Sequence, residues 1–314
     1  MRRIIFTILL ILTVNSLDAQ QDPQVSHYFF MKEFYNPAYA GYDGEICANF
    51  LSHQQWRGFE NAPFTNMLTL DTDLPSLGIQ SLDNAGIGIN FVNDQYGFVT
   101  DFRGNISLSY NFDLPIGSLR IGLSPGAFSK KFEAQWKFPD QTETIMTDQT
   151  NVFVFDIGGG IYYSVSNLFV SFSSFHITRP SFYFEVDNNS VGSIFLVNHY
   201  YLMAGYNLSL SNSALEITPS VFFKSDGREI QYDINIFALY NKKIWASVTY
   251  RNKDALAFFV GTSYFNNIRL GLSYDITLSY LNRVSNGTLE AYVGYCFSFI
   301  KPANAQKYRN VKTL

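Results

Sequence analysis

Long segments in which apolar and polar residues alternate are the feature that most restricts the fold of this chain. In the clearest segment, from Ile268 to Tyr280, every even position is apolar and every odd position is polar or glycine. Segments 102–112 and 289–299 repeat the pattern. Side chains alternate between the two faces of a β-strand, so the pattern predicts strands with one apolar and one polar face.

The length of these segments indicates a membrane protein. Strands of soluble proteins are commonly about 5 or 6 residues long, whereas these run to roughly 9 to 13, with aromatic residues near their ends, as in transmembrane barrels. The predicted fold is therefore all-β: a transmembrane antiparallel β-barrel of about 14 strands. The expected strands are 46–55, 64–72, 85–95, 99–112, 118–130, 151–164, 168–177, 197–210, 214–224, 230–240, 244–251, 256–264, 268–279 and 288–299.

The connections between these strands predict the orientation. From the fourth strand onward, short connections alternate with mostly longer ones, of which 133–150 and 178–196 are the longest. Outer-membrane barrels have short periplasmic turns and longer external loops. With an even number of strands, this phase places both termini in the periplasm.

The chain divides into four parts. Residues 1–19 have a basic start, an apolar run from Ile4 to Val14 and a small residue at Ala19, which predicts a cleaved signal peptide. Residues 20–43 carry seven aromatic residues without alternation, and one interpretation is a periplasmic segment that plugs the lumen, because a barrel interior must hold water or chain. Residues 44–299 form the predicted outer-membrane barrel. Residues 300–314 form a basic tail, interpreted as periplasmic and solvated.

Several classes of function are disfavoured. The net charge of −4 provides no positive field for nucleic acid. His27, His53, His176 and His199 are scattered, without the spacing of a zinc motif, so no metal site is predicted. The one G-x-S-x-G sequence, residues 122–126, lies within the expected strand 118–130 and not at the strand-to-helix turn that a nucleophile elbow requires. We therefore expect no enzymatic activity and no cofactor. Glycines inside the strands, such as Gly86 and those at 158–160, fit sheet curvature or close backbone approach better than a phosphate loop.

Three short motifs carry a resemblance to a known family. They are Asp22-Pro23-Gln24, Asn36-Pro37-Ala38-Tyr39-Ala40-Gly41 and Gln55-Trp56-Arg57-Gly58-Phe59, followed at the other end by Tyr295-Cys296-Phe297. Through these motifs the chain resembles the PorP/SprF family of the type IX secretion system, and the resemblance covers nearly its whole length. The resemblance implies an outer-membrane barrel that works with the secretion or gliding-motility machinery, or that exports and anchors a large surface adhesin. It implies no cofactor.

The resemblance also suggests partners and binding residues. Its partners would be secretion-system proteins, a periplasmic lipoprotein and adhesin-type cargo, in contact with outer-membrane lipid and not with nucleic acid. The candidate partner-binding or structural residues are Asn36, Pro37, Tyr39, Gly41, Gln55, Trp56, Gly58 and Phe59. The first four are expected at or inside the periplasmic mouth, and the last four in the external loop between the first two strands.

Two alternatives stay open for the function. Trp56 could anchor its loop or contact cargo, because a buried indole packs through its ring and needs a partner for its N–H. The competing function is a passive porin or a hydrophobic-solute channel, which needs an open lumen and usually a charged constriction. The candidate lumen charges are mixed in sign and scattered along the chain.

The two cysteines suggest a cross-link at the barrel seam. Cys47 lies in the first predicted strand and Cys296 in the last, and barrel closure makes these strands neighbours. The two residues have similar depth and both face the lumen by the parity of the alternation. A disulfide would form if the register brings the Cβ atoms within about 3.5 to 4.5 Å. The alternative is two separate lumen thiols.

Overall fold

A computed structural model describes residues 22–132, 152–187, 190–209, 214–264 and 267–298. The predicted signal peptide, the connection at 133–150 and the basic tail lie outside these residues. No helix in the described part of the chain has both the length and the apolar character needed to cross a bilayer.

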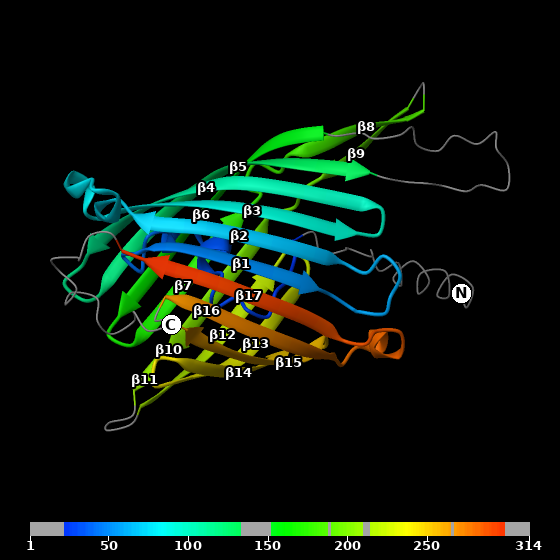
Figure 1. Ribbon diagram of the computed structural model, residues 1–314. Coiled ribbons are helices and arrows are strands. Elements are labelled where there is room, and N and C mark those ends of the chain that lie inside the picture. The colour runs from blue at the N-terminus through cyan, green and yellow to red at the C-terminus, as the bar shows by residue number, and fades with distance from the viewer. Residues whose placement is uncertain (1–21, 133–151, 188–189, 210–213, 265–266, 299–314) are drawn as a thin grey trace, which may run out of the picture.

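The strands form a closed antiparallel barrel (Figure 1). The barrel strands are β1 (Ile46–Gln54), β2 (Phe64–Asp73), β3 (Ala85–Tyr96), β4 (Val99–Asp113), β5 (Ser118–Phe132), β6 (Val152–Val165), β7 (Leu168–Phe175), β10 (His199–Tyr206), β11 (Leu208–Ser209), β12 (Leu215–Ser225), β13 (Ile230–Tyr240), β14 (Ile244–Arg251), β15 (Ala255–Tyr264), β16 (Ile268–Thr277) and β17 (Thr288–Phe297). Pairing of β1 with β17 and of β10 with both β7 and β12 closes the ring. Because β10 and β11 share one register against β12, they form a single strand, and the barrel has 14 strands, as predicted.

Several short elements are not part of the barrel wall. A hairpin of β8 (Ser181–Asp187) and β9 (Ser190–Phe195) lies in the connection 178–196, for which the alternation predicts no strands. Its Phe182 is buried against Phe128 and Leu196, and this packing stabilises a hairpin that lies outside the barrel ring. The short helices are α2 (Lys32–Tyr35), η1 (Pro37–Tyr39), η2 (Pro75–Leu77), η3 (Gln80–Leu82) and η4 (Tyr280–Arg283).

The connections define two ends of the barrel. At the end called here the short-turn end, β1 begins, β17 ends, and the connections include 114–117, 166–167 and 241–243. The opposite end, called the long-loop end, carries the connections 55–63, 176–198 and 278–287. One longer connection, 74–84, lies at the short-turn end and contains η2 and η3.

The apolar face of the strands is the outer face of the barrel, as the alternation predicts. Six apolar side chains from the alternating segments are exposed by 43 to 56%, which in a membrane barrel means contact with lipid. They are Ile106, Leu108, Leu270, Leu272, Ile276 and Val293. Their neighbours Ser273 and Asp275 are buried on the lumen side. Phe297, at the end of β17, is half-buried.

Leu272→Arg should destabilise the barrel by about 2 to 4 kcal/mol, because it places a charge on the lipid face near the middle of β16. The measurement is urea unfolding in lipid vesicles, followed by heat-modifiable gel mobility. Val284→Arg is the control, because Val284 is exposed to a similar extent, 54% against 56%, but lies in the connection after η4. Equal effects of the two substitutions would contradict the assigned lipid face.

Candidate functional site

Residues 22–43 lie inside the barrel and are called here the lumen segment (Figure 1, darkest blue). Asp22 contacts Arg103 and Tyr201, which lie near the long-loop ends of β4 and β10. At the other end of the segment, the Gly41 N–H donates to Asp71 Oδ2 over 3.0 Å, near the short-turn end of β2. The lumen segment therefore crosses the barrel once, from the long-loop end to the start of β1.

The Asn-Pro-Ala-Tyr-Ala-Gly motif joins the lumen segment to the barrel wall. Pro37 begins the short helix η1, and the Asn36 side chain caps it by accepting a hydrogen bond from the Ala38 N–H over 2.9 Å. The same Asn36 amide donates to the Ile161 carbonyl over 2.8 Å and to Ser171 Oγ over 2.7 Å. One side chain thus shapes the motif and binds it to β6 and β7.

Glycines in the barrel wall leave room for the backbone of this motif. A Cβ added at Gly122 would overlap backbone atoms of Pro37 and Ala38, and one at Gly86 would overlap the Ala40 carbonyl. Beside them, Arg120 donates to the Ala38 carbonyl over 3.1 Å and to the Ala40 carbonyl over 2.8 Å. These inward-facing glycines therefore permit the close backbone approach that the sequence analysis considered for glycines within strands.

Glu290 of β17 holds the first half of the lumen segment. Its buried carboxylate accepts hydrogen bonds from the Ser26 N–H over 2.7 Å and the His27 N–H over 3.0 Å. The ring Nδ1 atoms of His27 and His53 also bond to it, the latter over 2.7 Å. A buried carboxylate is stable only with such partners, so Glu290 couples the lumen segment to both β17 and β1.

Asp22 forms a second buried cluster, at the long-loop end. Its carboxylate pairs with Arg103, accepts a hydrogen bond from the Tyr201 hydroxyl over 2.8 Å, and lies 3.1 Å from His176 Nε2. Burial alone would raise the pKa of Asp22, but Arg103, His199 and His176 together hold it well below its usual value. The carboxylate is therefore ionised and firmly placed.

Two charged groups in the middle of the lumen segment have fewer partners. The Lys32 ammonium lies over the rings of Tyr39 and Phe169. The Glu33 carboxylate accepts a 2.9 Å hydrogen bond from the Asn90 amide. Both residues are buried, with 4% and 3% exposure.

A vestibule remains above the lumen segment at the long-loop end. It is a cavity of about 670 Å³ whose lining includes Asp22, Pro23 and Gln24 of the lumen segment together with Gln55 and Trp56. The other lining residues are Pro63, Thr65, Asp94, Tyr96, His199, Lys224, Ser225, Asp226, Glu229, Ile230, Gln231, Asn252, Lys253 and Asp254. The vestibule thus combines charges of both signs with aromatic surface.

The candidate residues from the sequence motifs separate into two groups. Asn36, Pro37, Tyr39 and Gly41 are buried toward the short-turn end. Gln55, Trp56, Gly58 and Phe59 lie in the connection between β1 and β2, where Phe59 is 51% exposed. Asp22-Pro23-Gln24, which was not among the candidate site residues, meets Gln55 and Trp56 at the vestibule. In the sequence, this triplet stood out only as one of the motifs that carry the family resemblance.

The loop that carries Trp56 is braced by the loop before β17. The Trp56 backbone N–H donates to Thr288 Oγ1 over 3.1 Å, and the Arg57 backbone N–H donates to the Gly287 carbonyl over 2.8 Å. Trp56 itself has a positive φ of 49° and is half-buried. The loop backbone is therefore held in place, and Trp56 lines the vestibule while part of its surface stays accessible.

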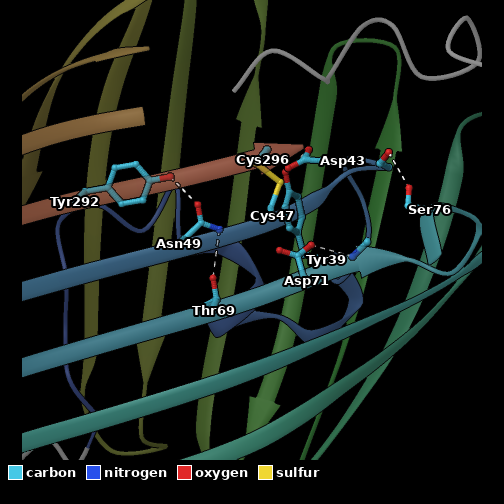
Figure 2. The surroundings of a disulfide bond; sticks show 11 residues. Tyr39, Asp43, Cys47, Asn49, Thr69, Asp71, Ser76, Tyr292 and Cys296 are labelled. Atoms are coloured by element: carbon cyan, nitrogen blue, oxygen red, sulfur yellow. Dashed lines mark hydrogen bonds between the residues drawn. A yellow bond between two sulfur atoms is a disulfide. The ribbon is translucent and has the colours of Figure 1, made fainter. Parts of the chain in front are cut away.

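The cysteines face each other across the seam. Cys47 of β1 is the direct register partner of Cys296 of β17, and their sulfur atoms are bonded at 2.12 Å. Figure 2 shows this pair at the short-turn end, close to Tyr39 and Asp43 of the lumen segment. Both cysteines are buried, with 2% and 5% exposure.

Comparisons with known proteins agree with this architecture. The sequence profile of the family described as "Type IX secretion system membrane protein PorP/SprF" matches residues 17–295. No curated protein sequence matches the chain.

Solved structures show the same fold at low sequence identity. The Ralstonia pickettii toluene transporter TbuX is similar with a TM-score of 0.50 and 13% identity, over 85% of this chain and 93% of the transporter. The CymD monoaromatic hydrocarbon channel is similar with a TM-score of 0.52 and 12% identity, over 86% and 93% of the two chains. At such identities the likeness concerns the outer-membrane barrel fold alone.

Proposed function

Because the chain belongs to the family of type IX secretion system membrane proteins PorP/SprF, we propose that this integral outer-membrane barrel binds other proteins of the secretion system as an accessory or a component. In this role it supports secretion or surface anchoring of cargo such as an adhesin. It needs no catalytic residue or cofactor for that role. The observation that carries the proposal is the lumen segment, which fills the barrel and is bonded to its wall at both ends.

We propose that the long-loop end faces the exterior and the short-turn end faces the periplasm, the usual arrangement of outer-membrane barrels. In this orientation β17 ends on the periplasmic side, so the basic tail 300–314 follows there. Asp22, in contrast, lies at the external end of the lumen. This position of Asp22 differs from the expectation that the amino-terminal segment begins on the periplasmic side, because Asp22 contacts Arg103 and Tyr201 near the long-loop end.

The periplasmic partners, including a lipoprotein, would bind at the short-turn end. Support comes from exposed apolar side chains in two of its connections: Leu77, Ile79 and Leu82 in 74–84, and Leu114 and Ile116 in 114–117. Clustered exposed apolar side chains are a common feature of protein interaction sites. The vestibule at the opposite end would receive the secreted cargo, through Trp56 and the mixed charges around it.

The test of the proposal combines binding and conductance. The affinity-tagged chain is captured from native membranes after mild cross-linking, and the purified barrel is inserted into planar bilayers. We expect co-purification of secretion-system proteins and an absence of steady ion-sized openings. Steady openings without such partners would favour the runner-up, a passive porin or hydrophobic-solute channel.

Trp56→Ala should leave barrel assembly intact and reduce surface display of the cargo at least several-fold, because it removes the aromatic surface from the vestibule wall. The measurement is surface labelling of cargo, with heat-modifiable mobility as the check of assembly. Phe59→Ala is the control, since Phe59 is in the same loop but does not line the vestibule. Failure of the Trp56→Ala barrel to assemble would indicate a loop anchor instead of cargo contact.

A further inference from the structure

His176 and His199 converge on Asp22 at the long-loop end. The three residues come from the lumen segment, the end of β7 and the start of β10, and one ligand atom from each lies within 4.8 Å of the others. The exposed fractions of Asp22, His176 and His199 are 6%, 0% and 2%. The set contains two imidazoles and one carboxylate, which are ligands that divalent transition metals prefer.

The surroundings of the two histidines match those of metal ligands. His176 Nδ1 bonds to Asp156 Oδ2 over 2.8 Å, and the same carboxylate accepts the His176 backbone N–H over 3.1 Å. His199 Nδ1 bonds to the Val197 carbonyl over 3.0 Å. Metal-binding histidines typically have one ring nitrogen held in this way by a carboxylate or a backbone carbonyl, which leaves the other nitrogen for the metal.

The free nitrogen of His199 provides an independent indication. Among the described residues, His199 Nε2 is buried without a hydrogen-bond partner. Burying an unpaired polar atom costs free energy, and a metal ion at this point would satisfy it. Each Asp22 oxygen accepts one of two bonds, Oδ1 from Arg103 and Oδ2 from the Tyr201 hydroxyl. Because an ionised carboxylate has about four lone-pair sites, a lone pair remains for a metal ion.

We propose that Asp22, His176 and His199 bind a divalent transition-metal ion, with Zn²⁺ as the representative ion. Ligand atoms around tetrahedral Zn²⁺ lie about 3.4 Å apart, given bonds of about 2.0 to 2.1 Å. Asp22 Oδ1 and His176 Nε2 lie 3.1 Å apart, and one ligand atom from each of the three residues lies within 4.8 Å of the others, so small side-chain shifts suffice to hold the ion. Asp22 and His199 both line the vestibule, which gives the ion a path from the exterior. The bound ion joins the first part of the lumen segment to the wall.

The site could not be predicted from the sequence, because Asp22 lies more than 150 positions before His176, and His176 lies 23 positions before His199. Only the pairing of β7 with β10 makes His176 and His199 neighbours. This placement adds a metal site to a chain whose histidine spacing indicated none. The proposal stands independently of the secretion function.

The test measures Zn²⁺ binding by the folded, tag-free full-length barrel in detergent. Calorimetric titration with ZnCl₂, together with metal analysis after dialysis, should give one ion per chain. His199→Gln should abolish this binding, and Asp156→Asn should weaken it about 10- to 100-fold by releasing His176. His53→Gln is the matched control, since His53 is also buried, also bonded through Nδ1 and also has an unpartnered Nε2, but lies outside the cluster.

The outcomes separate clearly. Loss of the single ion in His199→Gln, with retention in His53→Gln, supports the site. Absence of stoichiometric Zn²⁺ binding by the wild-type barrel overturns the proposal, and this result does not depend on any variant folding. Binding that persists in both His199→Gln and His176→Gln also overturns it, because the ion would then be held elsewhere.

Discussion

Removal of the Cys47–Cys296 cross-link should lower the free energy of unfolding by about 5 kcal/mol. The bond joins residues separated by 249 positions, and in the chain-entropy description a cross-link stabilises more as the loop that it closes in the unfolded chain lengthens. The measurement is urea unfolding in lipid vesicles, comparing wild type with Cys47→Ser/Cys296→Ser.

Two controls isolate the cross-link. The reduced wild-type protein retains both thiols without the bond, so it should resemble the double variant. Thiol labelling of the unfolded, unreduced wild type should detect no reactive cysteine. Two reactive thiols would show that the bond is absent from the native protein, and an unchanged unfolding midpoint in the double variant would contradict the stabilisation.

Gly122→Val should displace the lumen segment and convert the barrel into a conducting pore. The new side chain would overlap backbone atoms of Pro37 and Ala38, which cannot rotate away as a side chain can. We expect steady openings in planar bilayers, together with protease cleavage inside the lumen segment. The barrel wall itself, which is held by its strand pairing, should retain heat-modifiable mobility.

Gly159→Val is the matched control for this experiment. Gly159 lies in the neighbouring strand β6, and a Cβ there would be in ordinary contact distance, 3.5 Å from the Gly122 carbonyl. This variant should remain closed and resistant to protease. A closed, protease-resistant Gly122→Val barrel would contradict the assigned contact between the wall and the motif.

The barrel could be predicted because its information is local. Each strand shows its own alternation, and Leu272 and Ser273 face opposite sides in the structure as their parity requires. The hairpin of β8 and β9 was missed because it is short and is stabilised by the burial of Phe182 against Phe128, a contact across 54 positions. Sequence alternation gives no information about such distant packing.

The candidate site depended even more on distant contacts. Asn36 stands out in the sequence only as part of a motif, and its role emerges from bonds to Ser171 and the Ile161 carbonyl. Likewise, nothing in the sequence connects His27 with His53, whereas in the structure both rings bond to Glu290. A single sequence identifies the strands that form the wall, but not which wall residues meet the lumen segment.

The bond between Glu290 and the lumen segment has a consequence for biogenesis. Ser26 and His27 lie near the start of the described residues, whereas Glu290 belongs to the last described strand, 264 and 263 positions later, respectively. A chain released before β17 is complete would lack the carboxylate that holds its beginning, as well as the partner that closes its seam. Capture of the amino-terminal region is thus coupled to completion of the carboxy-terminal strand, so an unfinished barrel differs from a finished one in both lumen and seam.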